Sequence, residues 1–179
     1  MSYIDEVLAF NRDYVASKAY EAHVTDKYPG KKLAVLSCMD TRLSVLLQEA
    51  LGLKNGDAKV IKNAGAVIPT PWDSAMRSLI VAVYELGVEE IMVVAHTTCG
   101  ACHMSFHHFK DEMLKRGIPE SELCRNDIDL NVWLEGFHDT EHSVKQTVAS
   151  IVNHPLIPSD ITVRGFIIDS VTGALTEIV

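Results

Sequence analysis

The stretch Ile-Met-Val-Val-Ala-His-Thr-Thr-Cys-Gly-Ala-Cys, residues 91–102, joins a short apolar run to side chains that can bind a metal or react. The run at residues 91–95 has the length and composition of a buried strand, and it is followed by one imidazole and two thiols. Three interpretations are open at this point. His96 and Cys99 could bind a metal, Cys99 and Cys102 could form a redox pair, or all three side chains could simply pack.

Three other short apolar segments have the same character and predict further strands. They are Leu33–Cys38, Ala58–Lys62 and Ile161–Asp169. Segments with helical periodicity alternate with these strands, and a turn at Val171–Gly173 leads into a final extended stretch, Ala174–Val179. The alternation predicts an α/β fold: a mostly parallel sheet of four strands plus a short antiparallel edge strand, with helices on both faces.

The predicted helices cover four segments, and residues 103–153 consist otherwise of helix and loop. The helices are expected at about residues 4–20, 45–51, 73–87 and 141–153. Neither an internal repeat nor a low-complexity linker interrupts the sequence. We therefore expect residues 1–179 to form a single domain.

The composition of the chain limits the binding partners and the cellular compartment that we expect for it. The chain has 179 residues, 47% of them hydrophobic and 22% charged, which is typical of a globular protein. A formal net charge of −8 without a local basic patch argues against nucleic acid and anionic membranes as partners. The first residues do not have the pattern of a secretory signal, and no apolar run approaches the ~20 residues of a membrane span, so we expect a cytoplasmic protein.

Reactive side chains follow two of the predicted strands. The strand at residues 33–38 ends at Cys38, the first residue of Cys-Met-Asp-Thr-Arg at 38–42. The strand at residues 91–95 is followed by His96-Thr97-Thr98-Cys99. The carboxyl ends of neighbouring parallel strands meet at one edge of the sheet, so Cys38, His96 and Cys99 can converge there. Two thiolates and one imidazole are suitable zinc ligands, and a set of three leaves the fourth position open, as in catalytic zinc sites.

Asp40 and Arg42, which follow the strand at residues 33–38, are candidate catalytic residues. Two residues apart on a tight turn, they can form a carboxylate–guanidinium pair that keeps the carboxylate ionised. Alone, such a pair would contribute little as a surface salt bridge. Beside a candidate metal ligand, Asp40 can instead accept a hydrogen bond from a metal-bound water, and we favour that interpretation.

The two motifs resemble those of the β-class carbonic anhydrases, specifically their short prokaryotic type. The resemblance extends over nearly the whole chain. It is carried mainly by Cys-Met-Asp-Thr-Arg at 38–42 and His-Thr-Thr-Cys-Gly at 96–100. Further matches are Lys-Asn-Ala-Gly at 62–65, Pro-Leu-Ile-Pro at 155–158, Ile-Asp at 168–169 and Thr-Gly at 172–173. Three positions depart from the family pattern: Thr41 stands where serine is common, Thr98 where aspartate is frequent, and Cys102 is an additional thiol.

The resemblance implies a reaction and a cofactor. One zinc ion per chain would be held by Cys38, His96 and Cys99, and Asp40 and Arg42 would orient a zinc-bound hydroxide. The hydroxide would attack carbon dioxide and give bicarbonate and a proton.

The resemblance also implies a homodimer or an assembly of dimers, with the active-site cleft at the subunit interface. We expect the apolar helix at about residues 4–20 to pack on the partner subunit. A small apolar substrate needs aliphatic walls. Val67 and Ile68 after Gly65, or Leu79 and Val83, could supply them, and we assign Gly65 and Val67 as substrate-binding residues.

Two alternative functions stay open. A zinc-dependent relative could hydrolyse carbon disulfide or carbonyl sulfide, or bind zinc without catalysis. A Cys99–Cys102 thiol–disulfide oxidoreductase is also possible, although it gives no role to Cys38 or His96. In the zinc interpretation we expect Cys102 not to be a ligand, because a fourth thiolate would close the site.

Overall fold

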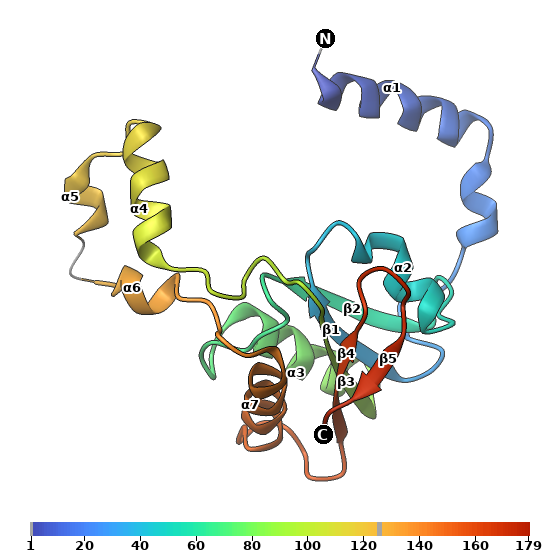
Figure 1. Ribbon diagram of the computed structural model, residues 1–179. Helices are drawn as coiled ribbons and strands as arrows, with labels where there is room; N and C mark the ends of the chain where they lie inside the picture. Colours follow the sequence, from blue (N-terminus) through green and yellow to red (C-terminus); the bar gives the residue numbers. More distant parts are fainter. Residues whose placement is uncertain (1, 125–126) are drawn as a thin grey trace.

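The computed structural model describes residues 2–124 and 127–179, and its centre is one five-stranded sheet (Figure 1). The strand order is β2-β1-β3-β4-β5, in which the first four strands run parallel and β5 runs antiparallel to β4. The strands are β1 (Leu33–Cys38), β2 (Ala58–Asn63), β3 (Glu90–His96), β4 (Thr162–Ile168) and β5 (Leu175–Glu177). The predicted sheet of four parallel strands with an antiparallel edge strand is confirmed.

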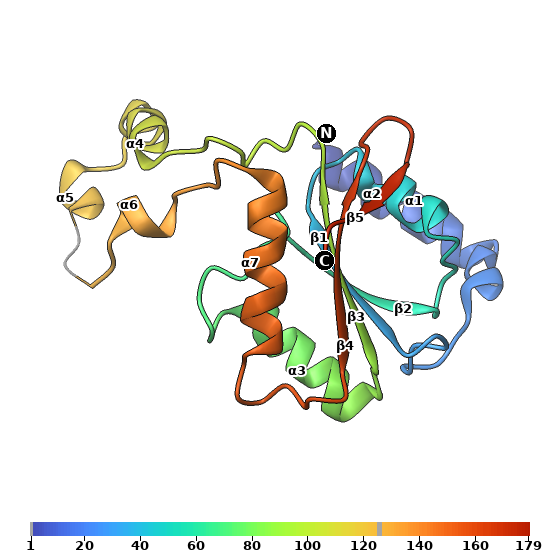
Figure 2. The same ribbon diagram turned by 60° about the horizontal axis from the view of Figure 1, so that its bottom comes forward.

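Helices connect the strands and cover both faces of the sheet (Figure 2). They are α1 (Tyr3–Ala16), the 3-10 helix η1 (Ala19–His23), α2 (Leu43–Ala50), α3 (Ser74–Leu86), α4 (Phe106–Lys115), α5 (Glu120–Leu123), α6 (Leu130–Trp133) and α7 (Thr140–Val152). The helix predicted at 4–20 is shorter than expected: it ends at Ala16, because Lys18 adopts a left-handed conformation with a φ of 57° before η1 begins.

Local signals in the sequence explain where the two long packing helices begin and end. Asp73 caps α3 by accepting a hydrogen bond from Met76 N at 2.7 Å, and Asp139 caps α7 through His142 N at 2.6 Å. Gly87 ends α3 with a φ of 69°, a left-handed conformation that favours glycine. The predicted ends of these helices at 73–87 and 141–153 therefore agree closely with the structure.

The two faces of the sheet pack against different helices. On one face, α3 and α7 bury Met76, Leu79 and Ile151 against side chains of β1 and β3. On the other face, α2 buries Leu43 and Leu47. The central strands are covered on both sides, and this accounts for their nearly continuous apolar sequence.

The strand order reverses at β1, which pairs with β2 on one side and with β3 on the other. A reversal of this kind opens a crevice outside the carboxyl ends of the two central strands. Cys38 is the last residue of β1 and His96 is the last residue of β3. The fold therefore places both candidate ligands at the switch point.

Two parts of the chain lie away from the sheet. Helix α1 projects from the rest of the molecule and buries none of its residues (Figure 1). Its exposed apolar side chains are Tyr3, Ile4, Val7, Leu8, Phe10 and Val15. Helices α4, α5 and α6 form a second projection on the opposite side (Figure 1). Among the described residues, every helix is too short or too polar to cross a membrane.

Candidate metal centre

Three potential ligands from two strand ends meet in a buried cluster. The Sγ atoms of Cys38 and Cys99 and a ring nitrogen of His96 all lie within 4.8 Å of one another. His96 is 0% exposed, and the two cysteines are 5% and 7% exposed. The convergence predicted for these residues is therefore what the structure shows.

The spacing of the two sulfurs fits a single tetrahedral ion. Their separation is 3.8 Å. Two thiolates bound ~2.3 Å from the same tetrahedral zinc would lie ~3.8 Å apart. The sulfurs thus need no rearrangement to share a metal.

The His96 ring is oriented as a metal ligand requires. Its Nδ1 lies 2.9 Å from the carbonyl oxygen of Thr97, and because a carbonyl can only accept, Nδ1 carries the proton. In the neutral ring Nε2 therefore keeps its lone pair. Nε2 is buried and has no hydrogen-bond partner among the residues that the structure describes. A buried polar atom of this kind is costly unless something binds it, and a cation beside the two thiols would do so.

A shared hydrogen bond shifts the pKa values of the two thiols in opposite directions. A hydrogen bond from Cys99 lowers the pKa of Cys38 to about 5. The same hydrogen bond, together with burial, raises the pKa of Cys99. Gly65 N also donates to the Cys38 sulfur, at 3.4 Å. A second thiolate beside the first requires a nearby positive charge, so the cluster is suited to a cation that both sulfurs bind.

Asp40 lies beside the cluster and is held by Arg42 in a bidentate ion pair. Arg42 Nε and Nη2 donate to the two carboxylate oxygens at 2.9 and 2.8 Å, and Arg42 N donates to Oδ1 at 2.9 Å. These contacts hold the pKa of Asp40 well below its usual range. Asp40 Oδ2 is 3.7 Å from His96 Nε2, so the ionised carboxylate faces the cluster.

Arg42 is itself held by two segments that are distant in sequence. Its Nη1 donates to Thr98 Oγ1 at 2.8 Å and to Ser170 Oγ at 3.2 Å, and its Nη2 donates to the Thr98 carbonyl at 3.0 Å. Ser170 is buried, and its backbone N–H donates to Thr97 Oγ1 at 3.0 Å. Sequence reasoning did not find Ser170, because a single serine after a strand carries no signal.

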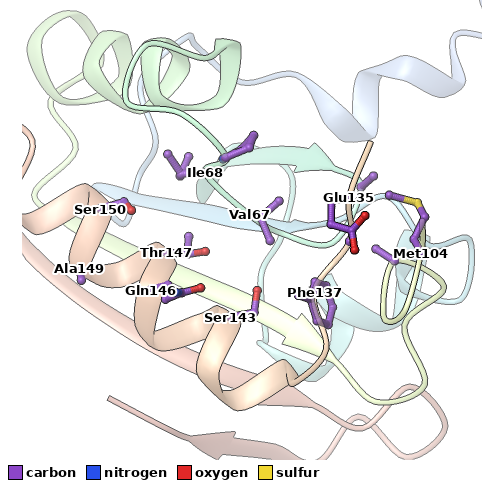
Figure 3. Close-up of a pocket in the computed structure, with 14 residues that line it drawn as sticks. Val67, Ile68, Met104, Glu135, Phe137, Ser143, Gln146, Thr147, Ala149 and Ser150 are labelled. Atoms are coloured by element: carbon purple, nitrogen blue, oxygen red, sulfur yellow. The ribbon is translucent and has the colours of Figure 1, made fainter. Parts of the chain in front are cut away.

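The two predicted substrate-binding residues lie in different surroundings. Gly65 contacts the Cys38 sulfur, and a Cβ at this position would meet Phe137 at 3.0 Å. Val67 lines a cavity of about 460 Å³ between α7 and the loop after β2 (Figure 3). Phe137 and Ala101 also line this cavity, whereas the three potential metal ligands do not.

Cys102 has different neighbours from Cys99. The sulfur of Cys99 lies beside that of Cys38, whereas the Cys102 sulfur lies 3.9 Å from the carbonyl oxygen of His138. All four cysteines of the chain are free thiols, and Cys102 is only partly buried. The arrangement therefore favours a Cys38–Cys99 pair over a Cys99–Cys102 redox pair.

Comparison with known proteins identifies relatives of the whole chain. Residues 33–175 match the family model described as carbonic anhydrase. YvdA of Bacillus subtilis (strain 168), which carries the carbonic anhydrase name, is 43% identical over 98% of this chain and 91% of its own length. The crystal structure of β-carbonic anhydrase isoform I from Trichomonas vaginalis superimposes with a TM-score of 0.92 and 35% identity, covering 100% of this chain and 98% of that one. A carbon disulfide hydrolase of Acidithiobacillus thiooxidans is 31% identical over 79% of this chain and 70% of its own length.

The geometry predicts which cysteine substitutions remove the metal from the protein. Protein purified without added metal should contain about one zinc per chain. Cys38→Ser and Cys99→Ser should lose it, because each removes one of the two thiolates, whereas Cys102→Ser should keep it. Elemental analysis of the four proteins measures this directly. Loss of zinc from Cys102→Ser alone would contradict the assignment.

Proposed function

This chain belongs to the β-carbonic anhydrase family of enzymes, and from that premise we propose that it catalyses the reversible hydration of carbon dioxide to bicarbonate and a proton. Zinc is the proposed cofactor, one ion per chain, bound by Cys38, His96 and Cys99. One observation carries the proposal: a buried imidazole nitrogen that has no hydrogen-bond partner among the described residues and two thiols at tetrahedral spacing lie beside a carboxylate whose pKa is lowered by Arg42. That combination supports a catalytic rather than a structural metal.

The proposed roles of the protein residues follow from their donors and acceptors. When bound, zinc supplies the nucleophile by lowering the pKa of a coordinated water towards neutrality. Asp40, as an ionised carboxylate, can only accept hydrogen bonds. It can therefore hold the remaining proton of the attacking group and leave a lone pair directed at the carbon of the substrate.

Arg42 positions Asp40 in this scheme. Both carboxylate oxygens receive hydrogen bonds from the guanidinium, which opposes a swing of Asp40 onto the metal as a fourth ligand. Thr98 and Ser170 fix the guanidinium from its other side. We propose Gly65 and Val67 as substrate-binding residues, because the first borders the cluster and the second offers an aliphatic wall in the adjoining cavity.

A second candidate substrate is carbon disulfide. The 31% identity to a carbon disulfide hydrolase makes this chemistry worth testing. Both substrates are linear and apolar, and the ligands and the Asp40–Arg42 pair would serve either one. Carbon dioxide is preferred because the family model and the Trichomonas vaginalis structure carry the carbonic anhydrase name.

A stopped-flow assay with both substrates tests the proposed function. The zinc-loaded protein should accelerate the hydration of carbon dioxide, and Cys38→Ser should show only the buffer rate. Release of sulfide from carbon disulfide is followed with the same samples. Activity on carbon disulfide without activity on carbon dioxide would reverse the preference, and inactivity on both would reject the proposal.

Substitutions around the guanidinium test the positioning roles. Arg42→Ala should lower turnover by roughly 10- to 100-fold, because Asp40 loses its anchor, while zinc is retained. Ser170→Ala should cause a smaller loss, since Thr98 still holds Arg42, and Ser170→Thr should restore activity by returning the hydroxyl. Ser78→Ala, which removes an exposed hydroxyl on α3, is the control. An Arg42→Ala protein with unchanged turnover and pH profile would contradict these roles.

We further propose that the protein is a single-domain subunit of a homodimer in the cytoplasm, with α1 packed on the partner. The apolar side chains of α1 recur at helical spacing and lie exposed, and no residue of this helix is buried by the part of the chain that the structure describes. Such a surface is typical of an interface. Four free thiols suit the reducing conditions of the cytoplasm.

Light scattering tests the dimer. The unmodified protein at micromolar concentration should have the mass of two chains or a multiple of two. Leu8→Asp should shift the mass towards one chain, because it places a charge within the apolar face of α1. Asp13→Ser, on the same helix, should leave the mass unchanged. A single-chain mass for the unmodified protein would exclude the dimer.

A further inference from the structure

A second pair of potential metal ligands lies apart from the cluster of Cys38, His96 and Cys99. It occurs where the loop after Cys99 passes the segment that leads into α7. The Nδ1 atoms of His103 and His138 are 3.4 Å apart, and their ring centroids are 5.6 Å apart. Both side chains are exposed, so an ion could reach them from solvent.

Backbone hydrogen bonds fix the two segments against each other. His103 N donates to Phe137 O at 2.7 Å, and Gly136 N donates to Met104 O at 2.9 Å. Gly136 must be glycine here, because a Cβ would lie 2.1 Å from the Ala101 carbonyl oxygen. The imidazoles are therefore brought together by the backbone, and their proximity does not depend on flexible side chains alone.

The distance between the two Nδ1 atoms suits a shared metal ion. Two imidazole nitrogens bound ~2.0–2.1 Å from one tetrahedral ion lie about 3.3–3.4 Å apart. The two Nδ1 atoms are 3.4 Å apart, which is this spacing and is long for a direct hydrogen bond between the rings.

Glu135 is placed to support His138 as a ligand. Its Oε1 lies 3.8 Å from His138 Nε2, the nitrogen opposite the one that faces His103. Metal-binding histidines commonly donate their second N–H to a carboxylate, which fixes the ring and makes the ligand nitrogen more basic. A small rotation of the glutamate side chain would complete this contact. Glu135 lies beside Phe137 and Met104 at one end of the cavity (Figure 3).

We propose that His103 and His138 form a second binding site for a divalent transition-metal ion of the Zn²⁺, Ni²⁺ or Cu²⁺ type, with Glu135 supporting His138. Imidazole is a preferred ligand for these ions. Water would complete the coordination, and the Cys102 sulfur lies close by, 3.9 Å from the backbone carbonyl oxygen of His138. With two neutral protein ligands this site binds more weakly than the cluster with two thiolates, so it fills second. A bound ion would tie the loop that follows Cys99 to the segment before α7.

Equilibrium dialysis with Zn²⁺ tests the proposal on protein already loaded with one zinc. The unmodified chain should bind a second equivalent more weakly than the first. His103→Ala and His138→Ala should each lose this second equivalent and retain the first, which also shows that they are folded. Glu135→Gln should bind the second equivalent about tenfold more weakly. His107→Ala, an exposed histidine on α4, is the matched control and should bind both equivalents.

Nuclear magnetic resonance of the imidazole groups identifies the ligands independently. The second equivalent should shift the ring resonances of His103 and His138 and leave those of His107 in place. Absence of a second equivalent at millimolar Zn²⁺, or a second equivalent that survives both alanine substitutions, would overturn the proposal. The pair would then be an imidazole–imidazole contact only. These outcomes do not depend on the proposed reaction, because they measure ion binding outside the catalytic cluster.

Discussion

The parallel pairing of β1 with β3 is the constraint on which the proposed metal centre depends. Ser37 lies opposite Val94 in this ladder, and its buried hydroxyl donates to the Val94 carbonyl at 3.0 Å. A shift of one residue in this register would turn alternate side chains to the other face of the sheet. Cys38 and His96 would then no longer meet at the switch point. The apolar packing on both faces, which fixes the register, is thus also what brings the ligands together.

Arg42 connects this sheet edge to the rest of the site. Its guanidinium contacts three segments: the turn after β1, the turn after β3 and the connection between β4 and β5. Thr98 adopts a left-handed conformation with a φ of 54°, and in it both the hydroxyl and the carbonyl of Thr98 accept from Arg42. A conformation that is unfavourable for threonine is retained where the surroundings hold it in place. The position of Asp40 therefore depends on residues that lie far apart in the chain.

Much of this arrangement could be predicted from the sequence, and the parts that could not have physical reasons. The potential ligands and the Asp40–Arg42 pair are recognisable because cysteine, histidine and charged residues directly follow apolar strands. Parallel strands bring such residues together at one edge of the sheet. Ser170 is 128 positions from Arg42, and nothing in its local sequence indicates the contact. The contact of His103 with His138 is hidden in the same way, because it depends on backbone pairing between two irregular segments. The predicted end of α1, at about residue 20, is wrong. The helix ends before Lys18, which adopts a left-handed conformation, and no glycine or proline in the sequence marks this end.

The central claim is that two thiolates and one imidazole form a metal site with an open fourth position beside Asp40. X-ray absorption spectroscopy of the protein loaded with one zinc per chain tests it most directly. The account predicts two sulfur neighbours at ~2.3 Å and two nitrogen or oxygen neighbours at ~2.0–2.1 Å. Arg42→Ala should keep the two sulfur neighbours. A third sulfur neighbour would place Cys102 on the metal, close the fourth position to water and contradict the account.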